Sequence, residues 1–118
     1  MRLEGKNRYE YFVKKVADER KLWGLRGASG WMLVGTDEGQ EALPVWPHER
    51  FALLCATGDW SGYSAEPIDL DGWLSRWIVG LEKDNRLVAV FPIPQHFGVA
   101  VDPRRLERDL NEELSCYE

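Results

Sequence analysis

The chain has 118 residues, of which 44% are hydrophobic and 30% are charged, and these proportions are typical of one folded domain rather than a disordered segment. Its net charge is −5, so most of its surface repels the phosphates of nucleic acids. No apolar run approaches the ~20 residues that a membrane helix needs. The sequence therefore predicts one domain over residues 1–118, with residues 1–6 as a loose N-terminal lead, and it excludes nucleic acid and membranes as partners.

The cellular compartment is predicted from the N-terminus and the cysteines. The opening residues contain no apolar stretch of the kind found in secretory signals. The two cysteines, Cys55 and Cys116, are too few for a disulfide scaffold. Together these features predict a cytoplasmic protein.

The first part of the chain predicts a helix followed by antiparallel strands. Asn7 and Glu10 have the spacing of a capping box, so the helix is expected to begin at Asn7 and to fade near Arg20. Pro44 cannot donate to a sheet ladder, which implies an edge or a bulge at that position. Three strands are predicted after the helix, at residues 22–26, 31–35 and 41–46.

A second helix is predicted to start at Pro47, because a proline suits the first turn of a helix. Phe51, Leu54 and Cys55 would form its buried face, and Gly58 would end it.

The third helix has the clearest pattern, since apolar residues recur with helical spacing over three turns after the capping residue Asp69. A short extended segment at residues 66–68 precedes it. Its apolar stripe consists of Leu70, Trp73, Leu74, Trp77, Ile78 and Leu81.

The last part predicts a strand at residues 87–91, covered on both faces because it is apolar throughout, and a partner strand at residues 97–101. Asp102 and Pro103 then start a final helix. The buried side of that helix consists of Leu106, Leu110 and Leu114. The predicted order αβββαβαββα indicates an α+β fold, with about four helices packed on a mixed or antiparallel sheet of five to six strands.

An aromatic groove is the main functional hypothesis from the residues. Trp46 and Trp60 fall at a strand end and in a loop, where their burial is not explained by periodicity. With neighbouring aromatic and proline residues they could line a groove for a protein or peptide partner, or form a secondary core. The candidate contact residues are Trp46, Pro47, Trp60, Tyr63, Phe91 and His96.

Two alternatives remain open. A small hydrolase or transferase could pair Cys55 or Cys116 with a histidine, although no catalytic-cysteine signature orders such a pair. A structural subunit of a larger assembly could use the leucine face of the last helix or the edge near Pro44. No catalytic residue, metal site or cofactor is predicted, because no two of the cysteines and histidines have metal-ligand spacing.

Several pieces of the chain are similar to the bacterial family known as domain of unknown function 2750. The matching pieces are Tyr9-Glu10-Tyr11-Phe12, Leu22-Trp23-Gly24-Leu25, Gly30-Trp31, Leu43-Pro44-Val45-Trp46-Pro47, Gly58-Asp59-Trp60-Ser61-Gly62-Tyr63, Gly80-Leu81-Glu82-Lys83-Asp84 and Val88-Ala89-Val90-Phe91-Pro92. They extend over roughly residues 8–116. The resemblance implies one cytoplasmic α+β domain, and it implies no activity.

Overall fold

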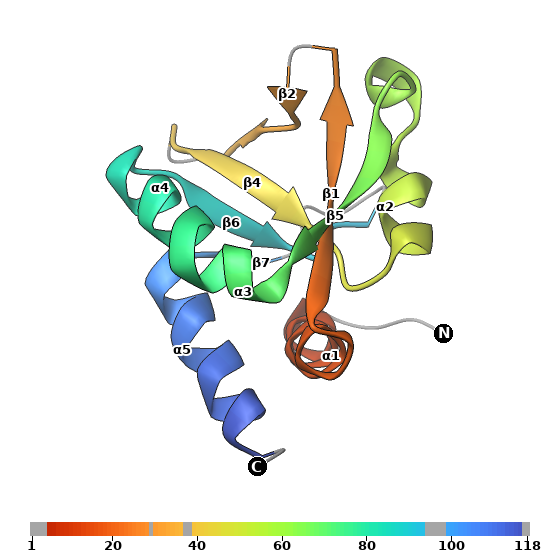
Figure 1. Cartoon of the computed structure of the whole chain (residues 1–118). Coiled ribbons are helices and arrows are strands. Elements are labelled where there is room, and N and C mark those ends of the chain that lie inside the picture. The colour runs from red at the N-terminus through yellow and green to blue at the C-terminus, as the bar shows by residue number, and fades with distance from the viewer. Residues whose placement is uncertain (1–4, 29, 37–38, 94–98, 117–118) are drawn as a thin grey trace.

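The computed structural model describes residues 5–28, 30–36, 39–93 and 99–116, and it shows an α+β fold (Figure 1). The helical elements are α1 (Gly5–Glu19), α2 (Glu49–Cys55), a 3-10 turn η1 (Gly58–Trp60), α3 (Leu70–Gly72), a π-helical turn η2 (Trp73–Trp77), α4 (Ile78–Lys83) and α5 (Pro103–Ser115). The strands are β1 (Lys21–Gly27), β2 (Gly30–Trp31), β3 (Val34–Gly35), β4 (Glu41–Val45), β5 (Ser64–Asp69), β6 (Leu87–Val90) and β7 (Val99–Val101). The predicted fold class is confirmed.

The described strands form two sheets, where the sequence predicted one. The first has the order β2-β1-β5 and is antiparallel throughout, and the second has the order β3-β4-β6-β7. In the second sheet β4 and β6 are parallel, whereas the other pairs are antiparallel, so this sheet is mixed as predicted. The two sheets join at Trp23 and Trp46, whose backbone N–H groups each donate to the other residue's carbonyl at 2.9 and 2.8 Å.

The predicted second strand is divided between the sheets. Trp31 pairs with Arg26 of β1, whereas Val34 pairs with Ala42 of β4. Between them the N–H of Met32 still donates to the carbonyl of Leu25. The segment therefore crosses from one sheet to the other within three residues, and an apolar run cannot reveal such a change of partner.

Pro44 lies where β4 changes its neighbours. The carbonyl of Val45 accepts from the N–H of Phe91, so the backbone of Val45 faces the β6 side. Because backbone groups alternate in direction along a strand, the missing N–H of Pro44 faces the opposite side. On that side the neighbouring strand is β3, which pairs with Glu41 and Ala42 and does not extend to Pro44. The predicted local edge at this proline is therefore present, although β4 lies inside the sheet.

The first helix begins earlier than predicted. It includes Gly5 and Lys6, which the sequence assigned to a loose lead, and it places Asn7 within a turn rather than at the cap. Arg8 is buried, and its Nε donates to the carbonyl of Phe91 at 3.1 Å. This contact fixes the first turns of the helix to the end of β6. The predicted C-terminal end is correct, because α1 stops at Glu19.

The second helix is shorter than predicted. Its N-cap is His48 rather than a residue before Pro47, and its C-cap is Ala56, so Gly58 starts the next turn. Leu54 was predicted to be buried but is 55% exposed. Ala52 lies on the buried face instead, together with Cys55.

Residues 70–83 form one helical run, as predicted, with a π-helical turn in its middle. Asp69 caps the run, because its Oδ2 accepts from the N–H of Gly72 at 3.2 Å. The extra residue in a π turn rotates the side chains that follow. Trp73, at the start of this turn, is fully buried, whereas Trp77, at its end, is only partly buried and stacks on Trp73 at 5.9 Å between ring centroids.

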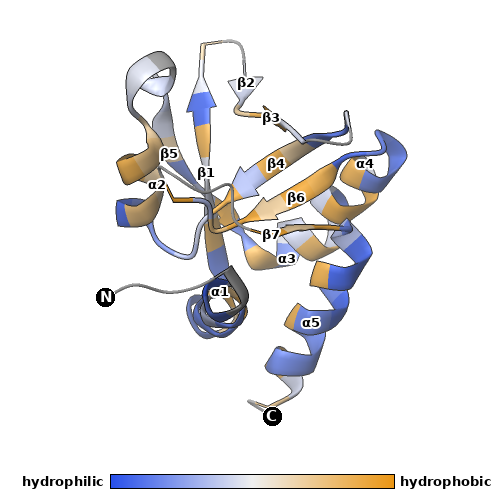
Figure 2. Cartoon of the chain, turned by 180° about the vertical axis from the view of Figure 1, so that it is seen from behind, coloured by the Kyte–Doolittle hydropathy of each residue, from blue (hydrophilic) through white to orange (hydrophobic). Residues whose placement is uncertain are grey.

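The core lies where the helices α1, α3 to α5 and the β4-β6-β7 strands meet (Figure 1). Figure 2 shows apolar residues along β6 and β7, while α1 and α5 are largely hydrophilic on their outer sides. Leu106 and Leu110 of α5 are fully buried, and Leu114 packs partly against the same core. The leucine face proposed as a contact for a larger assembly is therefore occupied by the protein's own core. Among the described helices, none is long and apolar enough to cross a membrane.

Replacing Asp102 with alanine is expected to lower the free energy of unfolding by about 1 kcal/mol. Its Oδ1 accepts from the N–H of Arg104 at 2.9 Å, and Pro103 occupies the first turn of α5 as predicted. The Asp102→Asn variant keeps a capping oxygen and is the matched control. Urea denaturation of both variants would check this prediction, and an alanine variant as stable as the parent would contradict it.

Candidate functional site

The predicted aromatic groove is not assembled as an open surface. Trp46 is 1% exposed and Phe91 is 3% exposed, and Pro47 is also buried. The indole Nε1 of Trp46 donates to the carbonyl of Pro92 at 2.8 Å, which uses its polar group inside the core. A partner could not contact these three side chains without rearranging the core, so their expected place in a groove is wrong.

Two of the other predicted contact residues, Trp60 and Tyr63, are partly buried. Tyr63 packs across Gly27 of β1, where an added Cβ would lie 3.0 Å from the tyrosine ring. Trp60, in η1, packs partly against the core. His96 lies outside the described residues. The structure therefore gives Trp60 and Tyr63 a packing role.

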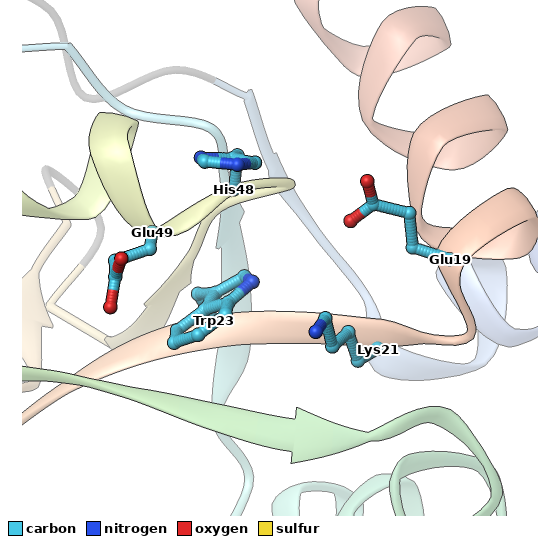
Figure 3. Close-up of a pocket in the computed structure, with 5 residues that line it drawn as sticks. All are labelled: Glu19, Lys21, Trp23, His48 and Glu49. Carbon is cyan, nitrogen blue, oxygen red and sulfur yellow. The ribbon is translucent and has the colours of Figure 1, made fainter.

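A different hollow lies near the junction of the two sheets, with a volume of about 360 Å³ (Figure 3). Its lining side chains come from three separate parts of the chain: the end of α1, the start of β1 and the start of α2. They are Glu19, Lys21, Trp23, His48 and Glu49. Figure 3 shows the indole of Trp23 below the imidazole of His48, with Lys21 and Glu19 on the side of α1.

A tight connection between α1 and β1 brings the first wall into place. Arg20 alone separates the helix from the strand and adopts a φ of 61°, a left-handed conformation that ends the helix. Its N–H donates to the carbonyl of Val16, and its own carbonyl accepts from the N–H of Leu70. These bonds hold Glu19 and Lys21 at the same side of the hollow.

The paired tryptophans bring the second wall into place. Because the backbones of Trp23 and Trp46 bond to each other, the chain two residues after Trp46 lies over β1. There His48 caps α2, since its Nδ1 accepts from the N–H of Arg50 at 3.1 Å. The side chain of the first α2 residue, Glu49, lies beside it (Figure 3).

The capping bond determines which nitrogen of His48 carries a proton. An Nδ1 atom that accepts a hydrogen bond is unprotonated, so the neutral ring carries its proton on Nε2. His48 is exposed. Its Nε2–H is therefore a donor that the capping role does not use.

Trp23 has a second unused donor. Its indole Nε1 is buried and has no hydrogen-bond partner within the described part of the chain. The Nζ of Lys21 lies 5.5 Å from the centroid of its ring, in a cation–π contact. A buried N–H without an acceptor is costly in the free protein, so a ligand that supplied an acceptor would gain binding energy here.

The charged groups of the hollow are only partly paired. Glu19 forms an ion pair with Lys15 at 3.2 Å, one helical turn away. Neither Lys21 nor Glu49 has an ion-pair partner among residues 5–28, 30–36, 39–93 and 99–116. The hollow thus offers one unpaired cation and one unpaired carboxylate, together with an aromatic floor.

Cys55 does not have the environment of an activated nucleophile. Cys55 is buried, its Sγ donates to the carbonyl of Pro92 at 3.4 Å, and burial raises the pKa of the thiol above its ordinary value. A catalytic thiolate needs the opposite shift. Cys116 is exposed near the end of α5. Among the described residues no group of three His, Cys, Asp or Glu side chains is arranged to hold a metal ion.

Thiol labelling of the native protein at neutral pH is expected to modify Cys116 and to leave Cys55 unreacted. Burial and a raised pKa both keep Cys55 as a protected thiol. Mass spectrometry of the labelled parent and of a Cys116→Ser control would separate the two sites. Rapid labelling of the Cys116→Ser protein would contradict this prediction and would revive the Cys/His hydrolase or transferase hypothesis.

A smaller hollow of about 200 Å³ lies between α1 and α5 and has a structural explanation. The hydroxyl of Tyr9 donates to Asp109 there, and burial together with this bond raises the pKa of Tyr9. The guanidinium of Arg105 lies 5.4 Å from the tyrosine ring centroid. These contacts tie α1 to α5, so we assign this hollow to packing between the two helices.

Sequence reasoning missed the hollow over Trp23 because its walls are far apart in the chain. Trp23 lies in a predicted strand and His48 near the start of a predicted helix. Their separation in the sequence matches no motif that would bring them together. One local signal was available: His48 follows Pro47 directly and precedes a helix, the position of an N-cap.

The family of the chain is identified by comparison with known proteins. The model of the family described as "Protein of unknown function (DUF2750)" matches residues 9–110, which is most of the chain. Searches of curated proteins and of solved structures find no match. The resemblance in the motifs is therefore confirmed, and the chain belongs to the DUF2750 family.

Proposed function

We propose that this protein is a non-enzymatic binding module that holds a segment of a protein or peptide in the hollow over Trp23. The observation that carries the proposal is the unpartnered indole N–H of Trp23 beside a hollow of about 360 Å³. Binding pockets of this size commonly combine an aromatic surface with a few polar groups that fix the ligand's orientation.

The chemistry of the lining favours binding over catalysis. The hollow contains an imidazole whose Nδ1 is committed to a helix cap, and its carboxylates are exposed or ion-paired. General acid–base chemistry needs a group whose proton affinity is tuned to its task. Aromatic and charged side chains on rigid elements are instead the usual anchors of a recognition surface. We place this role in the cytoplasm, in keeping with two free thiols.

The proposal is tested by NMR titration of the ¹⁵N-labelled protein with a set of capped tripeptides that vary the central side chain. Binding in the hollow predicts saturable shifts of the Trp23 indole N–H and of the amides near His48. The same titration with a His48→Asn variant separates recognition from folding, because asparagine keeps the N-cap. Peptides that leave the Trp23 indole unmoved, or that shift it equally in the parent and the variant, would contradict the proposal.

A further inference from the structure

We propose, resting on the binding role above, that the hollow recognises a segment in which a carboxylate side chain lies next to a cationic side chain. Within the described part of the chain, the lining groups without a partner are one ammonium, one carboxylate and two N–H donors. A ligand of mixed charge satisfies all of them at once, whereas a ligand of one sign leaves either Lys21 or Glu49 without a partner.

The indole N–H of Trp23 and the ammonium of Lys21 lie on the same side of the hollow. In Figure 3 the indole nitrogen of Trp23 lies at the end of the ring nearest Lys21 and Glu19. Lys21 is exposed, and its ammonium lies 5.5 Å from the centroid of the Trp23 ring. A long exposed lysine side chain moves at little cost. An arriving carboxylate therefore draws Lys21 off the ring and gains access to the buried indole N–H.

This exchange strengthens the interaction in two ways. A hydrogen bond from an N–H to a carboxylate is stronger than one to a neutral acceptor. It also satisfies a donor that is buried without a partner in the described structure of the free protein. The Nε2–H of His48, on the opposite wall, is placed to donate to the backbone or side chain of the same segment.

The acidic groups provide the second half of the recognition. Glu49 is exposed and unpaired within the described chain. Glu19 has Lys15 as its partner, but an ion pair between partly exposed groups on one helix is weak and can be shared. The net charge of −5 also favours a cationic group at the rim. A cation beside the ligand carboxylate therefore has Glu49 as its main partner, and Glu19 is a second acceptor on the opposite wall.

Four capped dipeptides test this inference on the full chain: acetyl-Glu-Lys-amide, acetyl-Glu-Gln-amide, acetyl-Gln-Lys-amide and acetyl-Gln-Gln-amide. Their affinities are measured by NMR titration for the parent and for Lys21→Met and Glu49→Gln. Both substitutions are at exposed positions, so the fold is expected to be kept. We expect the doubly charged peptide to bind most tightly, with each charge contributing about two- to tenfold.

The variants separate the two halves of the site. Lys21→Met is expected to reduce the preference for the ligand carboxylate without changing that for the cation, and Glu49→Gln to reduce only the preference for the cation. Equal affinities for the four peptides, or charge preferences that the two substitutions leave undiminished, would overturn the inference. If capped tripeptides still bind over Trp23 in that case, the binding module stands. If no peptide shifts the Trp23 indole at millimolar concentration, both proposals fall.

Discussion

Replacing Trp46 with alanine is expected to lower the free energy of unfolding by about 3–5 kcal/mol, the range for removing a buried tryptophan. The side chain is 1% exposed and lies at the bridge that joins the two sheets. Its loss leaves a cavity there and removes the indole donor to the Pro92 carbonyl. Urea denaturation with far-ultraviolet circular dichroism would measure the change.

The Trp46→Phe variant removes the hydrogen bond while it keeps much of the packing. It keeps an aromatic ring but removes the N–H, so the Pro92 carbonyl retains only the weak thiol donor from Cys55 within the described structure. A loss of about 1–3 kcal/mol is expected, the cost of leaving a buried acceptor poorly satisfied. An alanine variant that unfolds at the same urea concentration as the parent would show that Trp46 is not a core residue.

Replacing Trp73 with alanine is expected to cost a similar 3–5 kcal/mol. This indole is fully buried and stacks on Trp77, whose ring meets that of Trp31 edge-on at 5.0 Å between centroids. Trp31 in turn lies against Gly24, where an added Cβ would be 2.9 Å from its ring. The alanine variant therefore loses the support of an aromatic cluster that packs α3, η2 and the first sheet together.

The phenylalanine variant of Trp73 should behave differently from that of Trp46. The Nε1 of Trp73 is buried and lacks a hydrogen-bond partner among the described residues. Removing it relieves a desolvated donor, which offsets part of the lost packing. Trp73→Phe is therefore expected to cost less than Trp46→Phe in the same urea experiment. A larger loss at Trp73 would mean that its indole N–H has an acceptor in solution.

The elements that could be predicted from the sequence are those fixed by local patterns. Asp69 and Asp102 were predicted as caps and accept the expected backbone N–H groups, because capping involves residues two or three positions apart. The long stripe from Leu70 to Leu81 predicted the third helical run for the same reason. Its π turn was not predicted, since the stripe alone does not show where an extra residue is accommodated.

The arrangement of the sheets depended on contacts between distant residues. The segment from Trp31 to Val34 changes partner strands, and the bridge between Trp23 and Trp46 joins positions more than twenty residues apart. In the run before Trp46 every side chain from Ala42 onward is buried, so no alternation indicated on which face the indole would lie. For this reason Trp46 was expected on the partner-binding surface, whereas it is a buried core residue.

The candidate site could not be predicted for a related reason. Trp23 and His48 face each other because Arg20 turns α1 directly into β1 and because the two sheets meet at Trp46. Both features are tertiary. The sequence directed attention to Trp46 and Trp60, whereas the tryptophan that lines the hollow is Trp23.

The most direct test is a crystal structure of the protein with acetyl-Glu-Lys-amide. The peptide is expected over Trp23. Its carboxylate should contact Lys21 and the Trp23 indole N–H, and its ammonium should lie beside Glu49. Density for the peptide elsewhere on the molecule, with Lys21 still resting on the ring, would contradict this expectation.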